Sequence, residues 1–367
     1  MRIGLLTTSY PRFPGDISGT FVATFADDLR AEGHEVEVLA PEPRDATESA
    51  PRDPTWVRYA PRALERTFHG AGVPDNLRTD PLAWLGAGTY PLALLQAARR
   101  RVERWDALVT HFGLPAGPIA EAIRGARPHL CVWHSADVHL QARLPRWTRG
   151  WLHRPGLAHW VVTEDARKRL GLGPDTVVEP MRAVLGPLPT REAARRALNV
   201  EGFVVGVLAR LVPIKGIEVL IEACAELDDV TLLVAGDGPE RPRLETLARA
   251  RGVRSRFLGW VRGPGAKERV LAAADVMAFP SRRLRSGRSE GAPVALREAR
   301  LAGRPTLVSR AIDAEEGLGD DEWAAALRRV RQSPPAVVRP SASASMAPRA
   351  LAALRAARDG SRRAAGT

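Results

Sequence analysis

The sequence predicts an α/β fold made of two doubly wound parallel-sheet domains. Three observations indicate this fold class. Short apolar runs of β type alternate with helical segments in both halves of the chain. The alternation breaks at residues 186–189, which contain one glycine and two prolines, and restarts at Phe203. The 367 residues suffice for two domains of ordinary size. We expect an amino-terminal domain over residues 1–185, a carboxyl-terminal domain over 186–332, and a linker with a terminal helix over 333–367.

The amino-terminal half opens with a strand, a glycine-containing loop and a helix. Residues 1–8 are a β-type run, and apolar side chains at helical spacing from Phe21 to Leu29 end at Gly33. The loop lacks the Gly-x-Gly-x-x-Gly pattern, which counts against a dinucleotide-binding oxidoreductase. Residues 41–77 are expected to be irregular. The further elements expected in this half are strands at 36–39, 106–110, 129–133, 160–163 and 177–181, and helices at 84–104, 117–124 and 165–170.

The carboxyl-terminal half repeats the alternation, and four strand–helix units in succession predict a parallel sheet. After Ser309 the pattern weakens, so we expect this sheet to lack an edge strand. The expected strands are 203–208, 230–235, 256–260 and 275–280, and the expected helices are 217–225, 241–251, 267–274, one within 311–331 and one at 347–358.

The chain is strongly basic, with a formal net charge of +12, and nearly all of its cations are arginines. Its three lysines are Lys168, Lys215 and Lys267. This bias reflects either a GC-rich genome or a preference for anionic partners such as membrane lipids or nucleotides. Basic runs interleaved with aromatic residues do not stand out in the sequence, so nucleic acid is not an expected partner.

Cysteine usage and hydropathy predict a cytoplasmic location. Cys131 and Cys224 lie far apart in apolar segments, and we expect both to be reduced core residues. Residues 81–98 carry no charge but contain two prolines and two glycines, so we do not expect a membrane-spanning helix there. We expect this segment to pack on the sheet as a helix with a basic end. The alternatives are a peripheral contact with an anionic membrane at its inner face, or an acceptor-binding wall.

The polar loop and short helix within residues 285–305 contain the strongest candidate site. Pro293 suits the first helical position, because the N–H that proline lacks is unpaired at a helix start, and Gly303 is the matching stop. Glu290 therefore lies in the loop, and Glu298 lies inside the helix, roughly 7.5 Å from Pro293 along the axis. An isolated pair of glutamates is usually solvated, so the surrounding sequence must decide whether this pair has a function.

The start of this helix is a predicted anion site. The backbone at Gly291, Ala292 and Val294 and the positive end of the helix dipole face the loop. One carboxylate precedes this site and one follows it. A nucleotide sugar has the matching order of sugar hydroxyls, diphosphate and ribose hydroxyls.

Two cations flank the loop that follows the strand at 203–208. Arg210 and Lys215 converge on one point, where each charge-assisted contact with a diphosphate would contribute roughly 1.5–3 kcal/mol. Two solvated surface cations are the alternative. The rarity of lysine in this chain favours a function for Lys215.

A histidine and an aspartate follow the strand at 129–133. Ligands of open α/β sheets gather at the carboxyl ends of the strands, which is where His134 and Asp137 are expected. A lone histidine is more often structural, but this position favours a functional one. His111, after the preceding strand, is a second candidate.

Together these motifs resemble the retaining glycosyltransferases of family 4, the glycosyl transferases group 1, over residues 1–310. The resemblance implies the GT-B fold, in which two Rossmann-like domains face a central cleft. The family pattern at the histidine is His-Gly-x-Asp, so Ser135 departs from it. The segments that carry the resemblance are Tyr10 to Phe21 with Gly15 and Gly19, His134 to Asp137, Arg210 to Gly216, and Phe279 to Glu298.

The resemblance also implies roles for residues in the carboxyl-terminal half. Glu290 would hold hydroxyls of the donor sugar, and Glu298 would hold the ribose. Arg210 and Lys215 match the phosphate-binding loop of the family.

In the amino-terminal half, the resemblance implies that His134 contacts the donor sugar near the reacting carbon and that Asp137 holds the loop. Gly19 would let the backbone approach the donor phosphates. Asp237 and Leu258, in the other half, would line the nucleotide pocket.

The sequence therefore predicts a retaining hexosyl-type glycosyltransferase that needs no metal ion and no cofactor. Its partners would be a UDP-, GDP- or ADP-linked sugar as co-substrate and an unidentified hydroxyl acceptor, either a glycan, a lipid or a small molecule. A phosphorylase or a pseudoglycosyl-coupling enzyme on the same fold is one alternative. A non-catalytic relic that binds nucleotide is another, suggested by Ser135 and the weak pattern after Ser309.

Overall fold

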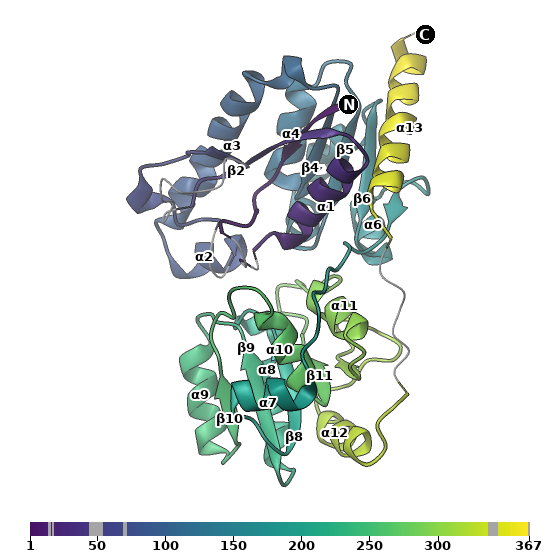
Figure 1. Cartoon of the computed structure of the whole chain (residues 1–367). Helices are drawn as coiled ribbons and strands as arrows, with labels where there is room; N and C mark the ends of the chain where they lie inside the picture. Colours follow the sequence, from purple (N-terminus) through teal and green to yellow (C-terminus); the bar gives the residue numbers. More distant parts are fainter. Residues whose placement is uncertain (14–15, 17, 44–53, 69–71, 337–343, 366–367) are drawn as a thin grey trace. The chain divides into compact units, whose positions relative to one another are not determined.

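A computed structural model of the whole chain describes all residues except 14–15, 17, 44–53, 69–71, 337–343 and 366–367. The chain divides into two compact units (Figure 1). The first comprises Met1–Arg182 together with Ala344–Thr367, and the second comprises Ala183–Ser343. Each unit is described by itself.

The first unit contains a parallel sheet of seven strands in the order β3-β2-β1-β4-β5-β6-β7. β1 is an interior strand, pairing with β2 through Leu5 and Val38 and with β4 through Leu5 and Val109. The strands are β1 (Arg2–Leu6), β2 (Glu35–Pro41), β3 (Thr55–Val57), β4 (Ala107–His111), β5 (His129–Trp133), β6 (Leu157–Val161) and β7 (Val177–Val178).

Helices cover both faces of this sheet. The strand order runs outward from β1 in both directions, so right-handed crossovers place the helix between β1 and β2 on one face and the helices between β3 and β7 on the other. α1 (Thr20–Ala31) and α13 (Ala347–Ala365) contact each other on one face, and α13 also contacts β5 and β6 (Figure 1). The remaining helices of the unit are α2 (Val73–Thr79), α3 (Ala83–Arg99), α4 (Gly113–Ile123), α5 (Ala136–Arg143) and α6 (Glu164–Leu170).

The end of the chain returns to the first unit. Met346, Ala350 and Leu354 are buried there, and the backbone N–H of Met346 donates to Asp28 at 2.8 Å. Arg182 forms an ion pair with the same carboxylate. The terminal helix therefore docks on the amino-terminal sheet, because its apolar side chains find the face beside α1.

The second unit contains a parallel sheet of five strands in the order β10-β9-β8-β11-β12. Its core packs β8, β9 and β11 between α8 and α12 on one face and α7 and α10 on the other. The strands are β8 (Phe203–Leu208), β9 (Val230–Ala235), β10 (Ser255–Phe257), β11 (Val276–Phe279) and β12 (Thr306–Val308). The helices are α7 (Arg191–Leu198), α8 (Ile217–Ala225), α9 (Arg241–Ala250), α10 (Ala266–Ala273), α11 (Val294–Leu301) and α12 (Trp323–Gln332).

The predicted fold class of two parallel α/β units is confirmed, but several elements differ from expectation. β7 covers two residues instead of 177–181. β3 lies within 41–77, where no strand was expected, because three residues pair with the edge of β2. β12 supplies an edge strand that the pattern did not predict.

The helix expected within 311–331 is shorter than predicted. α12 begins only at Trp323, and the acidic residues before it form turns in which Asp313 accepts backbone N–H groups of Glu315 and Glu316. Gly317 packs so closely that an added Cβ would lie 2.4 Å from the Ser309 carbonyl. These local bonds compete with a helix.

Candidate active site

Four neighbouring strands of the second unit end at one rim, where several predicted site residues lie. Because all the strand pairs are parallel, the loops after β10, β9, β8 and β11 leave the same edge of the sheet. Lys215 lies after β8, Asp237 after β9, Leu258 after β10 and Glu290 after β11. The fold therefore brings together residues that lie far apart in the sequence.

Lys215 and Glu290 form an ion pair at this rim. Their side chains are 15% and 18% exposed, so the pair is largely shielded from water. The other carboxylate oxygen of Glu290 accepts the hydroxyl of Ser281, whose own backbone carbonyl accepts the hydroxyl of Ser309. Burial alone would raise the pKa of Glu290, but Lys215, Ser281 and the nearby charge of Arg210 outweigh it and hold the pKa below its usual value. The carboxylate is therefore charged in the folded protein.

The loop that carries Lys215 is held against the residues that follow β11, at the start of the glutamate loop. Arg282 donates its backbone N–H to the carbonyl of Ile214 at 2.9 Å. Gly216 has a φ of 61°, and an added Cβ would lie 2.2 Å from the carbonyl oxygen of Pro280. A side chain is therefore excluded at this position. The sequence Ile-Lys-Gly makes this close approach possible and fixes the position of Lys215.

The helix after the glutamate begins one residue later than predicted. Pro293 has an extended ψ of 123° and is the residue before the helix, so Val294 is the first helical residue. The first turn of α11 contains no acidic side chain that would occupy its amide end. Gly291 and Ala292 are partly exposed and lead into this helix start. This end of α11 keeps the positive dipole that an anion needs.

Glu298 is engaged differently from Glu290. The ammonium of Lys267 lies 2.6 Å from its carboxylate and 3.0 Å from the carbonyl of Val184. Burial raises the pKa of Glu298 despite Lys267, and the charge of Glu268 adds to that rise. Lys267 was not identified as a site residue from the sequence. The rarity of lysine in this chain, which has three, could have pointed to it.

Asp237 and Leu258 mark the ends of neighbouring strands. One oxygen of Asp237 lies 3.0 Å from the guanidinium of Arg241, and the other accepts the backbone N–H of Gly238. Leu258 donates its backbone N–H to Val234 at 2.9 Å and is partly exposed. Both positions are held by backbone bonds at the rim.

In the first unit, His134 and Asp137 lie at the carboxyl end of β5. Asp137 is buried and accepts the backbone N–H of Gly113 at 2.7 Å and that of His134 at 3.1 Å. Burial raises the pKa of Asp137 to about 6, although the backbone donors oppose this. Ser135 has a φ of −144°, which any residue adopts, so the serine fits without backbone strain.

His134 is surrounded by rings. The Phe21 and Phe112 rings lie 4.7 and 4.5 Å from its centroid, and His111 of β4 lies within hydrogen-bonding distance. Loss of water around the half-buried imidazole lowers the pKa of His134 to about 3. The ring is therefore neutral at physiological pH.

Gly19 precedes α1 and has a φ of 64°. An added Cβ there would lie 2.6 Å from the backbone of Ser9, so the internal packing of this loop already requires glycine. Gly15 lies outside the described residues.

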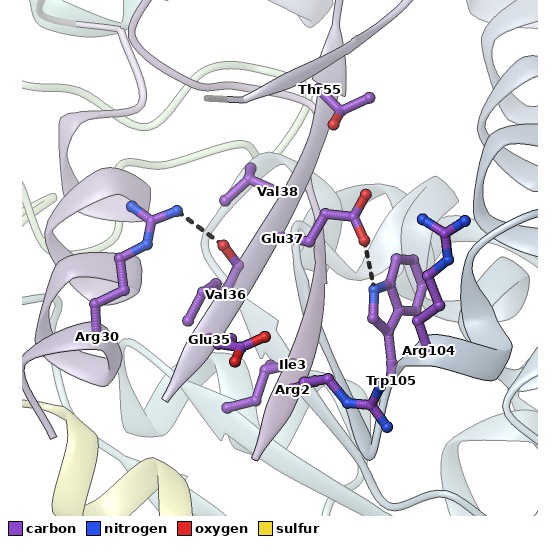
Figure 2. A pocket seen from close by; sticks show the side chains of 10 residues that line it. All are labelled: Arg2, Ile3, Arg30, Glu35, Val36, Glu37, Val38, Thr55, Arg104 and Trp105. Atoms are coloured by element: carbon purple, nitrogen blue, oxygen red, sulfur yellow. Dashed lines mark hydrogen bonds between the residues drawn. The ribbon is translucent and has the colours of Figure 1, made fainter. Parts of the chain in front are cut away.

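A cavity of about 620 Å³ in the first unit lies away from these residues (Figure 2). It is at the amino ends of β1 and β2, whereas His134 follows the carboxyl end of β5. In it Trp105 donates to Glu37 at 2.8 Å, and Arg30 donates to the carbonyl of Val36 at 2.9 Å (Figure 2). Among the residues that the structure describes, no group of three histidine, cysteine or acidic side chains is arranged to hold a metal ion.

Two parallel α/β units with polar clusters at strand carboxyl ends define the class of GT-B glycosyltransferases. The family model for the glycosyl transferase 4-like domain matches residues 18–199, and that for glycosyl transferases group 1 matches residues 202–339. The chain belongs to this family.

Two curated relatives illustrate the similarity. The chain is 33% identical over 162 residues to the lipopolysaccharide core biosynthesis glycosyltransferase LpsD of Rhizobium meliloti, covering 40% of this chain and 45% of that protein. It is 28% identical over 346 residues to the GDP-mannose-dependent alpha-(1-6)-phosphatidylinositol monomannoside mannosyltransferase of Mycolicibacterium smegmatis. This match covers 86% of this chain and 82% of that protein. The chain thus matches about half of the length of the first relative.

Solved structures share the fold at low identity. Sucrose-phosphate synthase from Thermosynechococcus elongatus superposes with a TM-score of 0.69 and 17% identity, over 99% of this chain and 94% of that one. The Anabaena protein HepE in complex with UDP-glucose superposes with a TM-score of 0.67 and 18% identity, over 100% of this chain and 99% of that one.

Proposed function

We propose that this protein is a retaining glycosyltransferase that moves a sugar from a nucleoside diphosphate donor to a hydroxyl acceptor. The observation that carries the proposal is the cluster of Lys215, Glu290 and Ser281, with Arg210 nearby, beside the amide end of α11. Cations, a helix start and a buried carboxylate at strand ends form a site for a diphosphate attached to a polyol.

The reaction breaks the bond between the anomeric carbon and the diphosphate oxygen, and the bonding electrons leave with the diphosphate. Lys215 and Arg210 would stabilise this growing negative charge, and such preorganised groups supply the largest catalytic term in comparable steps. The acceptor hydroxyl would form the new bond on the same face of the sugar and pass its proton to the departing phosphate oxygen. Glu290 need not act as a nucleophile, because its carboxylate would hold sugar hydroxyls.

Relatives support the donor class. One curated relative is named as dependent on GDP-mannose, and the Anabaena structure contains UDP-glucose. A UDP-, GDP- or ADP-linked sugar is therefore the proposed co-substrate. We further propose that transfer needs no metal ion and that His134, as a neutral ring, contacts the donor sugar.

The experiment is mass spectrometry of products formed from a panel of UDP-, GDP- and ADP-sugars with hydroxyl acceptors. NMR of the product gives the anomeric configuration, and retention is expected. Inversion, or phosphorolysis with inorganic phosphate in place of transfer, would overturn the proposed reaction. Donor binding without transfer or hydrolysis would favour the non-catalytic relic.

An anionic membrane surface is a second proposed partner, carried by the outer face of α3. Its inner face buries Ala83, Tyr90 and Leu94, as expected for a helix on a sheet. A surface helix is normally polar on its other side, yet Leu85 and Leu92 are 51% and 69% exposed there. Two further features favour a membrane. Trp84 is 62% exposed at one end, and Arg99 and Arg100 are exposed at the other. Among the described residues, no helix is long and apolar enough to cross a bilayer.

Vesicle sedimentation tests this surface. The wild type should bind vesicles of phosphatidylcholine with phosphatidylglycerol more strongly than pure phosphatidylcholine. The double substitution L85Q/L92Q should reduce binding by more than about 100-fold, because each leucine contributes about 1.5–3 kcal/mol when buried in lipid. L140Q removes a 51% exposed leucine of α5 and is the matched control. Equal binding of the double variant and the control would reject the proposed surface.

A further inference from the structure

His111 ends β4 beside His134, and its imidazole is fully buried. Its Nδ1 lies 3.2 Å from Nε2 of His134, and the two rings are stacked with their planes 21° apart. Phe25 covers His111 at 4.7 Å in an edge-to-face arrangement. Within the described part of the chain, His111 is the one side chain that hydrogen-bonds the imidazole of His134.

Two ring nitrogens joined by a hydrogen bond share a single proton, so one ring donates and the other accepts. Burial holds both rings in the neutral form, since it lowers the pKa of His111 well below its usual value and that of His134 to about 3. Each ring therefore carries one N–H. Which nitrogen of His134 carries it depends on which way the shared bond runs.

The second ring nitrogen of His111, which does not contact His134, decides which of the two rings donates the shared hydrogen bond. Its Nε2 is buried and has no hydrogen-bond partner among the described residues. If His134 donated, His111 would have to carry its own proton on that nitrogen, as a buried donor with nothing to receive it. Orphaned buried N–H groups are rarer than orphaned acceptors, and an unsatisfied donor loses a full hydrogen bond. The favoured arrangement has His111 donating from Nδ1 to Nε2 of His134.

In that arrangement His134 carries its proton on Nδ1. The two oxygens of Asp137 are engaged by the backbone N–H groups of Gly113 and His134, and no bond from them to the His134 ring is formed. Nδ1–H is thus left to donate to an oxygen of a ligand.

We propose that His111 is a positioning residue that fixes the tautomer of His134, so that the Nδ1–H of His134 donates to an oxygen of the bound sugar. The identity of the ligand as a sugar rests on the proposed function, whereas the tautomer of His134 does not. A protonated Nδ1 of His134 selects a ligand that presents a hydroxyl or another oxygen acceptor at this point. A ligand group that could only donate at this point would not be recognised.

The test is long-range ¹⁵N–¹H NMR of histidine-labelled protein without ligand, which separates protonated from unprotonated ring nitrogens. In the wild type, His134 should be protonated at Nδ1 and His111 at Nδ1. A His134 protonated mainly at Nε2 would overturn the proposal. This readout needs no turnover, so it remains decisive if the proposed glycosyl transfer fails.

Two variants separate positioning from packing. H111N can place its amide N–H where Nδ1 was, so it should keep the His134 tautomer and most of the activity. H111L fills the space without a donor, so His134 should become a mixture of tautomers and kcat should fall about tenfold. Backbone chemical shifts around Asp137 report whether each variant is folded. An unchanged His134 tautomer in a folded H111L would also overturn the proposal.

Discussion

The cluster around His134 in the first unit and the cluster around Glu290 in the second unit are both shielded from water, yet their charge states differ. His134 lies among phenylalanine rings and a neutral histidine, so burial leaves it uncharged. Glu290 has Lys215, Ser281 and the charge of Arg210 beside it, so it stays ionised despite burial. Burial therefore sets the charge state of His134, whereas at Glu290 the charged and hydrogen-bonding partners outweigh burial.

Removing the cation from the charged cluster should have the largest effect. K215A leaves the Glu290 carboxylate buried without its main partner, so the free energy of unfolding at neutral pH should fall by about 3 kcal/mol. Turnover should fall about 100-fold or more, because a charge-assisted contact with the diphosphate is lost. Chemical denaturation and product formation measure the two effects.

Two variants accompany K215A. K168A removes an exposed lysine of α6 and should change stability by less than about 0.5 kcal/mol. K215A/E290Q should recover part of the lost stability, because the unpaired charge is gone. A double variant no more stable than K215A would contradict the account of this pair.

The neutral cluster predicts a pH effect. The pKa of His134 falls from 6.5 to about 3 on folding, so the folded state binds fewer protons between these values than the unfolded state does. Its contribution to stability is therefore present above pH 6.5 and is lost as the pH falls through that window, by about 5 kcal/mol in total.

The difference in unfolding free energy between wild type and H134Q, measured across this pH range, isolates the effect. H153Q removes an exposed histidine and serves as the matched control. A difference between wild type and H134Q that does not change with pH would show that folding leaves the pKa of His134 at its ordinary value.

The smallest effect is expected where this chain departs from the family pattern. Ser135 has a negative φ of −144°, so no left-handed backbone demands glycine there. S135G should lower the unfolding free energy by about 0.5–1 kcal/mol, through the greater entropy of the unfolded chain. Thermal unfolding measures this difference. A stabilised S135G would mean that the serine is under strain that its φ does not show.

Local sequence patterns predicted most of the fold. The alternation of β-type runs with helical spacing located ten of the twelve strands in the described part of the chain, including β5 and β8, and the loop at Gly216. Short elements were missed because three-residue strands such as β3 and β12 have too little periodicity to recognise. Such strands form only because a neighbouring strand offers its edge.

Most residues of the candidate site were named from the sequence, but the ion pairs that they form were not predicted. Lys215 and Glu290 were both identified, since each lies in a motif with a glycine that fixes its loop. Lys267 was missed as the partner of Glu298, because α10 and α11 are brought together only by the packing of the second unit.

The sequence by itself determined the family, the fold class and the residue types at the strand ends, because these follow from local periodicity and short motifs. Only the tertiary structure decided which charges are paired, that the rings of His111 and His134 lie within hydrogen-bonding distance, and that the last helix packs beside α1. These outcomes depend on contacts between segments more than twenty residues apart, and the register of two sheets sets those contacts.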